Sequence, residues 1–438
     1  MRNQPRIRSA PKISGISERT VSPTETLSRA MTVAARKGVT RLADITGLDR
    51  IGIPVFTAVV PKSDDVLSVY NGKGILSADA RVGALMESIE RQTALNAEIE
   101  IVIGSYSRLR QSATPALNPS VFNQGLCNDY SSEKPYEWVY GFDLLARETV
   151  LVPGALGGFG LRFAGDGSPF RVYLSNGLAS GNCLEEAVCH ALCELVERDA
   201  WTLADLRSYW LPRARREARM NEPLDGAGQD DYDAYPRIDL HGAGWPIDEL
   251  VGKFERASLR VVVRDITSDV GVAVVIASAA DDWLPGFPQA HSGLGAHPNA
   301  EIAVIRALTE LAQSRAVDIQ GVREDILPAE FVPEEHETHT RRVAKIDHDR
   351  WILRDSGRVR RFGHMLSTWH SDIADDIQSI LDRLVSVGME RVIVVDLTEP
   401  GGFSVVRVIV PGLESWILDH GRLGPRALRF WKAHAVAS

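Results

Sequence analysis

One pattern of alanine, leucine and glutamate recurs three times in this chain, at intervals of about 110 residues. Its spacing is Ala-x3-Ala-Leu-x-Glu-x2-Glu/Gln, and the copies begin at Ala80, Ala187 and Ala303. The interval is too long for a short solenoid repeat. The spacing of the apolar residues in each copy is that of an amphipathic helix. The sequence therefore predicts three equivalent helices packed in one layer, with small alanines that permit close approach.

Each predicted helix gathers its charged residues on one face. On a helical wheel, the polar face of the second copy holds Glu186, His190, Glu194 and Glu197. The polar face of the first copy holds Glu87, Glu90 and Arg91, opposed by Val82, Leu85, Met86 and Ile89. The ordinary interpretation is a surface helix whose carboxylates face water. Three copies with the same Glu spacing disfavour that interpretation, because a solvated face does not need identical spacing.

A glycine-rich segment precedes each copy, at residues 71–74, 175–182 and 291–297. Glycine lets backbone N–H groups crowd together and point at an anion, and a helix N-terminus adds partial positive charge. The segments are therefore predicted to be loops that hold phosphate, while the carboxylates hold magnesium. Because Mg²⁺ takes only one or two carboxylates, five glutamates suggest more than one ion. Three arginines could neutralise phosphate or pair with the glutamates: Arg91, Arg198 and Arg315.

None of the standard nucleotide motifs is present. The chain has no G-x-x-x-x-G-K-[ST] sequence and no G-x-G-x-x-G that opens a helix after a strand. The residues alone thus indicate a non-standard ATP site. Cys183, Cys189 and Cys193 are interpreted as core-filling residues rather than a sulfur relay or cluster site, since no fourth soft ligand is evident. His190 is interpreted as a hydrogen-bonded structural histidine.

The remaining patterning alternates long helices with pairs of short strands. The predicted helices are 23–37, 78–97, 183–201, 299–320 and 371–387. The predicted strand pairs are 140–145 with 149–152, 260–266 with 271–277, and 391–397 with 404–410. Short links imply antiparallel pairing, so the fold class is α+β, a mixed α/β architecture rather than a doubly wound sheet.

Charge and length define the expected domain organisation of this 438-residue chain. Residues 1–41 carry nine Lys/Arg and two Glu, a net charge of +7. Because the whole chain has a net charge of −9, the remaining residues carry −16. Residues 1–22 are predicted to be a basic, flexible tail and residues 23–438 one large domain. Within that domain, 212–245 and 324–360 are expected to be surface insertions.

The same composition excludes several classes of protein. The acidic body argues against a nucleic-acid binder. No apolar run approaches the roughly 18 residues of a membrane helix. Four cysteines in a chain of this length give no disulfide framework, so a cytoplasmic location is expected.

Three blocks of the sequence resemble the YcaO superfamily. They are 68–74 with 84–91, 175–182 with 186–198, and 306–315. The resemblance extends from about Pro23 to Glu414 and implies a YcaO-type fold with the three Glu-bearing helices around an ATP site. It also implies ATP and Mg²⁺ as cofactors and ATP-dependent activation of a peptide backbone amide. A neighbouring Cys, Ser or Thr side chain then gives an azoline, and a sulfur donor gives a thioamide.

The resemblance also assigns individual residues. The implied metal ligands are Glu87, Glu90, Glu186, Glu194 and Glu197. The implied nucleotide contacts are Asn182 and Arg198 and, on weaker local matches, Lys73, Thr26, Arg29 and Arg315. Arg91 remains the further candidate for phosphate that its position in the first copy indicates.

Two segments resemble the branch of the superfamily that works with a TfuA partner, residues 38–55 and 408–414. That branch is linked to thioamidation of peptides or proteins, with TfuA helping to deliver sulfur. Azoline-forming members commonly end in a proline-rich tail, and residues 428–438 contain no proline. The predicted function is therefore thioamide formation with a TfuA-like partner and a sulfur donor.

Several alternatives to thioamidation stay open. They are an azoline-forming cyclodehydratase, an accessory factor in ribosomal-protein methylthiolation, and a non-catalytic scaffold for a peptide or partner. The presence of all five matched glutamates favours an enzyme over the scaffold. A homodimer is plausible from the sequence and is not decided by it.

Overall fold

The computed structural model describes residues 5–13, 18–122, 130–160, 163, 168–170, 175–218, 234–281, 289–321, 351–354, 357–415 and 423–435. Parts of the two predicted insertions, 212–245 and 324–360, lie outside these described residues, namely 219–233 of the first and 324–350 and 355–356 of the second. Within the described part of the chain, no helix has both the length and the apolar character needed to cross a membrane.

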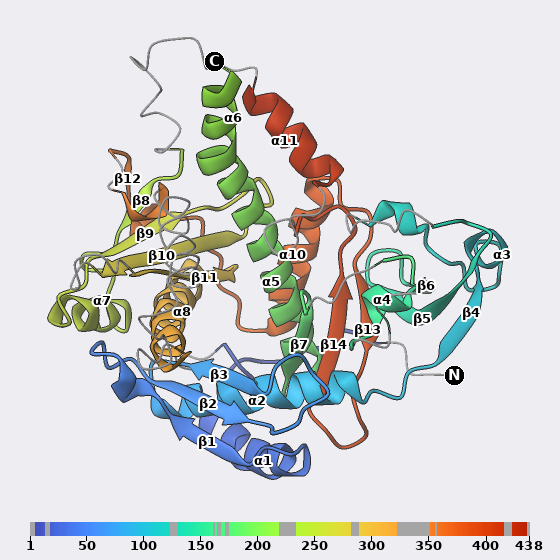
Figure 1. Ribbon diagram of the computed structural model, residues 1–438, viewed down its shortest axis with the longest axis horizontal. Coiled ribbons are helices and arrows are strands. Elements are labelled where there is room, and N and C mark those ends of the chain that lie inside the picture. Colours follow the sequence, from blue (N-terminus) through green and yellow to red (C-terminus); the bar gives the residue numbers. More distant parts are fainter. Residues whose placement is uncertain are drawn as a thin grey trace, which may run out of the picture.

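The helices and strands follow the predicted order (Figure 1). The helices are α1 (Pro23–Arg36), α2 (Ser77–Leu95), α3 (Tyr106–Leu109), α4 (Gly154–Gly157), α5 (Leu184–Asp205), α6 (Leu211–Ala218), α7 (Ile247–Arg256), α8 (Ala300–Gly321), α10 (Ile373–Ser386) and α11 (Pro425–Ala435). The first seven strands are β1 (Arg41–Asp44), β2 (Val55–Val59), β3 (Val69–Lys73), β4 (Ile101–Ser105), β5 (Pro135–Asp143), β6 (Glu148–Pro153) and β7 (Leu178–Gly181). The others are β8 (Arg237–Asp239), β9 (Val261–Asp265), β10 (Ala273–Asp281), β11 (Gln289–His297), β12 (Val359–Arg361), β13 (Ile393–Asp396) and β14 (Ser404–Ile409). All five predicted helices are present, each within a few residues of its expected bounds.

The strands form three sheets that are almost entirely antiparallel. Their orders are β1-β2-β3, β11-β10-β9-β8-β12, and β4-β5-β13-β14-β7 with β6 beside β5. Among the described strands, the only parallel pair joins β8 and β12. The three predicted strand pairs correspond to β5/β6, β9/β10 and β13/β14, all antiparallel. The mixed α/β fold class is thus confirmed.

The three glycine-rich segments are edge strands or lead into them, and this corrects the prediction that they are phosphate loops. Each strand runs into one of the repeated helices, giving the units β3–α2, β7–α5 and β11–α8. A Cβ on Gly72 would lie 2.1 Å from the backbone oxygen of Ala80, and one on Gly295 would lie 2.1 Å from that of Ala303. These glycines and the repeated alanines allow the strand and helix backbones to touch, which explains why small residues stand there.

The three units are arranged in a closed ring. Helix α2 contacts β7, α5 contacts β11, and α8 contacts β3, so each helix touches the strand of another unit. The repeated helices do not pack side by side in one layer, and that prediction is wrong. Because each helix lies between two strands, its polar face points toward the centre of the ring rather than to water.

The described part of the N-terminal segment is packed against the body, which corrects the expectation of a flexible tail. Ala10 and Pro11 contact Asp372 at the start of α10. The Lys12 ammonium forms ion pairs with Glu18 and with buried Asp376. Lys12 looked like part of a solvated tail because its partner Asp376 lies more than 350 positions along the chain, which patterning cannot reveal.

Candidate functional site

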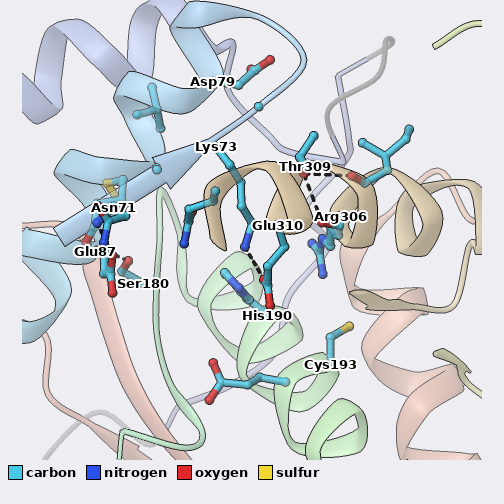
Figure 2. A pocket seen from close by; sticks show the side chains of 18 of the residues that line it. Asn71, Lys73, Asp79, Glu87, Ser180, His190, Cys193, Arg306, Thr309 and Glu310 are labelled. Carbon is cyan, nitrogen blue, oxygen red and sulfur yellow. Dashed lines mark hydrogen bonds and ion pairs between the residues drawn. The ribbon is translucent and has the colours of Figure 1, made fainter. Parts of the chain in front are cut away.

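A cavity of about 1320 Å³ lies at the centre of the ring. Its wall is formed by the strands and helices of all three units and by residues of the N-terminal segment up to Thr26. Figure 2 shows side chains from α2, α5 and α8 converging there. The repeated helices therefore meet at one site, as their common spacing predicts.

Five glutamates at the repeated positions of the three helices line this cavity: Glu87, Glu90, Glu194, Glu197 and Glu310. One equivalent glutamate from each copy accepts a backbone N–H bond from the strand segment of its own unit. The pairs are Asn71 with Glu87 (2.7 Å), Gly177 with Glu194 (3.1 Å), and Leu294 with Glu310 (3.3 Å). The N–H groups predicted to hold phosphate thus orient carboxylates. The identical Glu spacing is explained by this repeated hydrogen bond.

The carboxylates of the cluster are difficult to ionise together. Burial raises the pKa of Glu87, Glu90 and Glu194, and neighbouring carboxylates raise them further. Burial, with Glu310 and Glu194 nearby, raises the pKa of Glu197 to about 7. Burial alone would also raise the pKa of Glu310, but the Lys73 and Arg198 cations outweigh it and lower that pKa. Burial and mutual repulsion therefore make the fully ionised cluster unfavourable.

Glu310 is the metal-ligand candidate that the residue assignments omitted. Its carboxylate pairs with the Lys73 ammonium, and Figure 2 shows the two side chains meeting inside the cavity. The signal was present in the sequence, because Glu310 occupies the same place in the third copy as Glu194 in the second.

The four apolar residues of α2 that were predicted to lie opposite the glutamates do not all do so, and this corrects the prediction for the first copy. Val82 and Met86 line the cavity beside the glutamates, whereas Leu85 and Ile89 are buried in the core. Val82, Met86 and Glu90 are spaced by four residues, so they share one face. The cavity wall is thus partly apolar.

The implied nucleotide contacts Lys73, Thr26, Asn182 and Arg198 all line the cavity. The Thr26 hydroxyl donates to the Asn182 side-chain oxygen at 3.1 Å. The Arg198 guanidinium lies 3.9 Å from the Glu197 carboxylate and over the Trp201 ring. Two polar groups and two cations therefore face the same space as the carboxylates.

Glu186 lines the same cavity but has its oxygens occupied. One oxygen accepts the backbone N–H and the hydroxyl of Thr20, at 2.8 and 2.7 Å. The other accepts the backbone and side-chain N–H of Asn182, at 2.9 and 3.0 Å. Burial would raise the pKa of Glu186, but Arg19 and these donors lower it. Metal binding at Glu186 would require Thr20 to move away.

Two predicted nucleotide contacts are not at the cavity. Arg315 forms a two-pronged ion pair with Asp49, at 2.8 and 3.2 Å, and is 1% exposed. It lies one residue later in its copy than Arg91 and Arg198 do in theirs, and one residue turns a helix by about 100°. Ser314 occupies the equivalent place and lines the cavity. Arg29 donates to the Gly402 carbonyl at 2.5 Å.

Arg91 lines the cavity with its charge already paired. It binds both oxygens of Asp65, at 2.5 and 2.9 Å, and lies over the Phe159 ring. The arginines were expected either to neutralise phosphate or to pair with the repeated glutamates. Arg91 pairs with a carboxylate, but that carboxylate belongs to Asp65.

Burial also determines the protonation state of His190, which faces the cavity from α5 (Figure 2). Burial and the nearby Arg306, Arg19 and Lys73 cations lower its pKa well below the ordinary value. The imidazole is therefore neutral, because a positive charge there would be buried among other cations.

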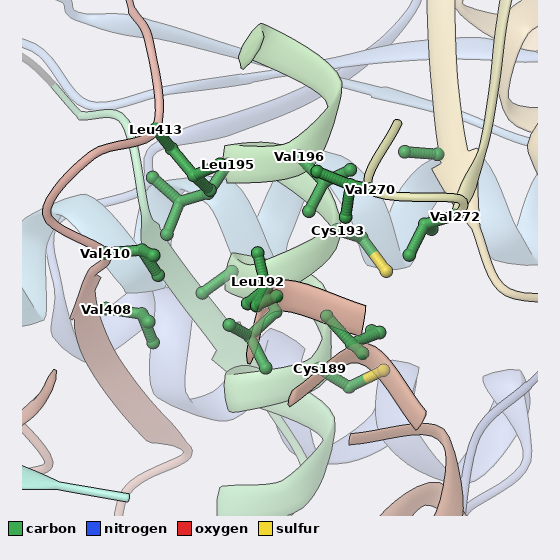
Figure 3. Packing of buried hydrophobic residues seen from close by; sticks show 14 of the residues in the cluster. Cys189, Leu192, Cys193, Leu195, Val196, Val270, Val272, Val408, Val410 and Leu413 are labelled. Carbon is green, nitrogen blue, oxygen red and sulfur yellow. The ribbon is translucent and has the colours of Figure 1, made fainter. Parts of the chain in front are cut away.

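Cys189 and Cys193 lie on the side of α5 that packs into the largest core cluster, beside Val270 and Val272 (Figure 3). Ligand atoms of Cys189, His297 and Asp376 lie within 4.8 Å of one another. However, Asp376 is paired with Lys12, and His297 Nδ1 accepts the Asn299 N–H at 3.0 Å. The geometry supports a core-filling Cys189 beside a hydrogen-bonded polar cluster, whereas Cys193, although buried in the same core, also lines the central cavity.

Comparison with models of protein families shows the family to which this chain belongs. Residues 71–414 match the model of a family described as YcaO cyclodehydratase, ATP- and Mg²⁺-binding. The chain belongs to the YcaO family. ATP and Mg²⁺ are the cofactors of that family, and the region matched contains all three repeated helices.

Two relatives of this YcaO chain match it over nearly their whole length. An uncharacterized protein of Methanothermobacter thermautotrophicus is 36% identical over 93% of this chain and 97% of its own. An uncharacterized protein in the tfuA 3' region of Rhizobium leguminosarum bv. trifolii is 33% identical over 96% and 94%.

Solved structures share the fold of the chain. YcaO from Methanopyrus kandleri, bound with AMPPCP and Mg²⁺, is 28% identical with a TM-score of 0.66, over 93% of this chain and 95% of that one. A heterocyclase in complex with substrate and cofactor has a TM-score of 0.74 at 20% identity, over 94% of this chain. The chain spans 54% of that heterocyclase, so this likeness concerns the fold.

The YcaO cavity here is chemically suited to the family's cofactors. Magnesium takes oxygen ligands, and the cluster supplies several carboxylates whose mutual repulsion a divalent cation would relieve. Lys73 and Arg198 supply the positive charge that a polyphosphate needs. The donor set thus fits both groups without any change of residue type.

Proposed function

We propose that this YcaO protein binds ATP with Mg²⁺ in the central cavity and activates a peptide backbone amide. The observation that carries the proposal is the cluster of five cavity-lining glutamates, brought together from three helices, in which burial and neighbouring carboxylates raise the pKa of Glu90 and Glu197. The 28% identical structure bound with AMPPCP and Mg²⁺ supports the same cofactors.

The proposed roles follow from the positions of the side chains. Glu87, Glu90, Glu194, Glu197 and Glu310 would hold magnesium, and Glu186 would join them only if Thr20 moved away. Asn182, Arg198 and Lys73 would bind the nucleotide from the surrounding wall. ATP would supply a phosphoryl group that turns the amide oxygen into a leaving group. The residues of the chain contribute by positioning the reactants and by neutralising charge.

We propose thioamide formation with a TfuA-like partner as the specific reaction. A 33% identical relative lies in a tfuA 3' region, and the two segments that resemble the TfuA-associated branch support the same assignment. Thioamide formation requires a donor of sulfide-level sulfur. The sulfur attacks the activated carbon, phosphate leaves with the former amide oxygen, and the amide nitrogen regains its proton.

The test compares the peptides and proteins of cells that carry the wild-type chain, Glu194→Gln or Glu249→Gln. Glu249 lies on α7 in an exposed pair with Arg256, away from the cavity, and serves as the matched control. Mass spectrometry should find one species in which sulfur replaces oxygen, present with wild type and Glu249→Gln and absent with Glu194→Gln.

The alternatives give different spectra in the same experiment. Loss of one water from a Cys, Ser or Thr peptide would indicate an azoline, and gain of a methylthio group would indicate methylthiolation. Either result would overturn thioamidation while retaining an active site at Glu194. Identical spectra from wild type and Glu194→Gln cells would overturn the enzymatic proposal and favour a scaffold.

A further inference from the structure

Most sheet edges in the described part of the chain are covered or protected. The free sides of β3, β7 and β11 face α8, α2 and α5 within the ring. Edge strand β1 carries exposed Arg41 and Asp44, and the three-residue β12 carries Arg360 and Arg361. Residues 115–117 pair along β6. Covering an edge, charging it and keeping it short are the usual defences against pairing with another chain.

In the part of the chain that the structure describes, strand β4 has none of these defences. Its sequence, Ile-Val-Ile-Gly-Ser, contains no charge and no proline. Ile101 is 40% exposed and Ile103 is 70% exposed, and both lie on the same face of the strand. Among the described residues, β4 forms backbone ladder bonds with β5 alone. Figure 1 shows the strand at the periphery of the molecule, far from the ring.

The chain that flanks β4 is charged in opposite senses at its two ends. Exposed Glu98 and Glu100 precede the strand, and exposed Arg108 and Arg110 follow it. An antiparallel partner with the same sequence would therefore place acidic residues beside basic ones at both ends. Self-complementarity of this kind is what a two-fold interface between identical chains requires.

We propose that β4 pairs antiparallel with β4 of a second copy of this chain, about a two-fold axis at Ile103. In that register the two Ile103 side chains meet and each Ile101 lies opposite Ser105. The acidic segment before one strand, with Glu98, then lies at the end where α3 of the other copy begins, with Arg108. The pairing joins two six-stranded sheets into one continuous sheet and covers the exposed isoleucines. It leaves the ring and its cavity free, since β4 does not line the cavity.

The first experiment measures the mass of the full chain by sedimentation across micromolar concentrations. Wild type should have twice the 48.1 kDa of one chain. Ile103→Lys should raise the dimer dissociation constant by roughly 100-fold or more, because two ammonium groups would be brought together in a dry interface. Val359→Lys, on the exposed and already charged edge β12, is the matched control and should stay dimeric.

A charge-reversal series tests the register itself. Glu98→Arg and Arg108→Glu should each weaken the dimer by roughly threefold, and the double variant should restore it, because the two-fold axis brings the acidic end of one strand to the α3 end of the other. Thermal melting of every variant checks that the fold is retained. A monomeric wild type, a dimer that Ile103→Lys leaves intact, or a double variant no tighter than either single one would overturn the proposal.

Discussion

Replacing Glu197 with glutamine is expected to stabilise the metal-free protein at neutral and alkaline pH. The side chain is 12% exposed and belongs to a cluster of carboxylates with which it shares few cations. Glutamine keeps the shape of the side chain and removes its charge. A substitution at a binding residue would thus increase stability while it weakens function, as expected where charge is held ready for a ligand.

The size and sign follow from the pKa. Burial and the neighbouring carboxylates raise the pKa of Glu197 from 4.5 to about 7. Because the folded value lies above the unfolded one, the favourable contribution is complete below about pH 4.5 and is lost as the pH rises to about 7. At about 1.4 kcal/mol for each pKa unit, the gain for Glu197→Gln should grow from about 1 kcal/mol at pH 5 to about 3 kcal/mol at pH 8.

The assay is thermal melting in the presence of a chelator. Unfolding entropy is about 0.9 kcal/mol/K for a chain of this length, so the variant should melt about 3 °C above wild type at pH 8 and about 1 °C above it at pH 5. Glu249→Gln, an exposed control, should change the midpoint by less than about 1 °C. With Mg²⁺ and ATP the order should reverse, because only wild type retains the ligand. A variant that melts below wild type at pH 8 in chelator would refute the reasoning.

Three further substitutions separate the parts of the site. Lys73→Met removes the ammonium that lowers the pKa of Glu310 and should weaken Mg·ATP binding by roughly tenfold in calorimetry; unchanged affinity would exclude Lys73 from the site. Gly72→Ala would place a Cβ 2.1 Å from α2 backbone atoms and should lower the free energy of unfolding by about 3 kcal/mol or more. Gly47→Ala, with nothing within 4 Å, should be nearly neutral in the same denaturation experiment. Arg315→Met leaves a buried carboxylate unpaired and should cost about 3–5 kcal/mol of stability without changing the ATP affinity of the folded protein; a loss of affinity would return Arg315 to the nucleotide site.

The helices and the glutamate set were predictable because periodicity records which face of a helix meets its neighbours. The identical spacing of Glu87, Glu194 and Glu310 indicated a common environment, and the structure shows that environment as one backbone hydrogen bond made three times. The same periodicity accounts for Arg315, which stands one residue later in its copy than Arg91 and Arg198 do in theirs. Its position, counted from the start of the third copy, is enough to place it off the polar face.

Other features depended on tertiary contacts that no local pattern records. Glycine is required both for an anion-binding loop and for close packing of two backbones, so the identity of Gly72 and Gly295 is compatible with either, and only their neighbours in the fold distinguish the two. Lys12 looked like part of a solvated basic tail because its partner Asp376 lies on α10, at the other end of the sequence. Burial decided both cases, and burial is a property of the whole fold.

Calorimetric titration of ATP, with and without Mg²⁺, tests the central claim most directly. Wild type and Glu249→Gln should bind ATP only when Mg²⁺ is present, and Glu194→Gln should lose that binding while it keeps a normal melting profile. Equal binding by wild type and Glu194→Gln, or binding of the same strength without Mg²⁺, would contradict a magnesium–nucleotide site built on the repeated helices.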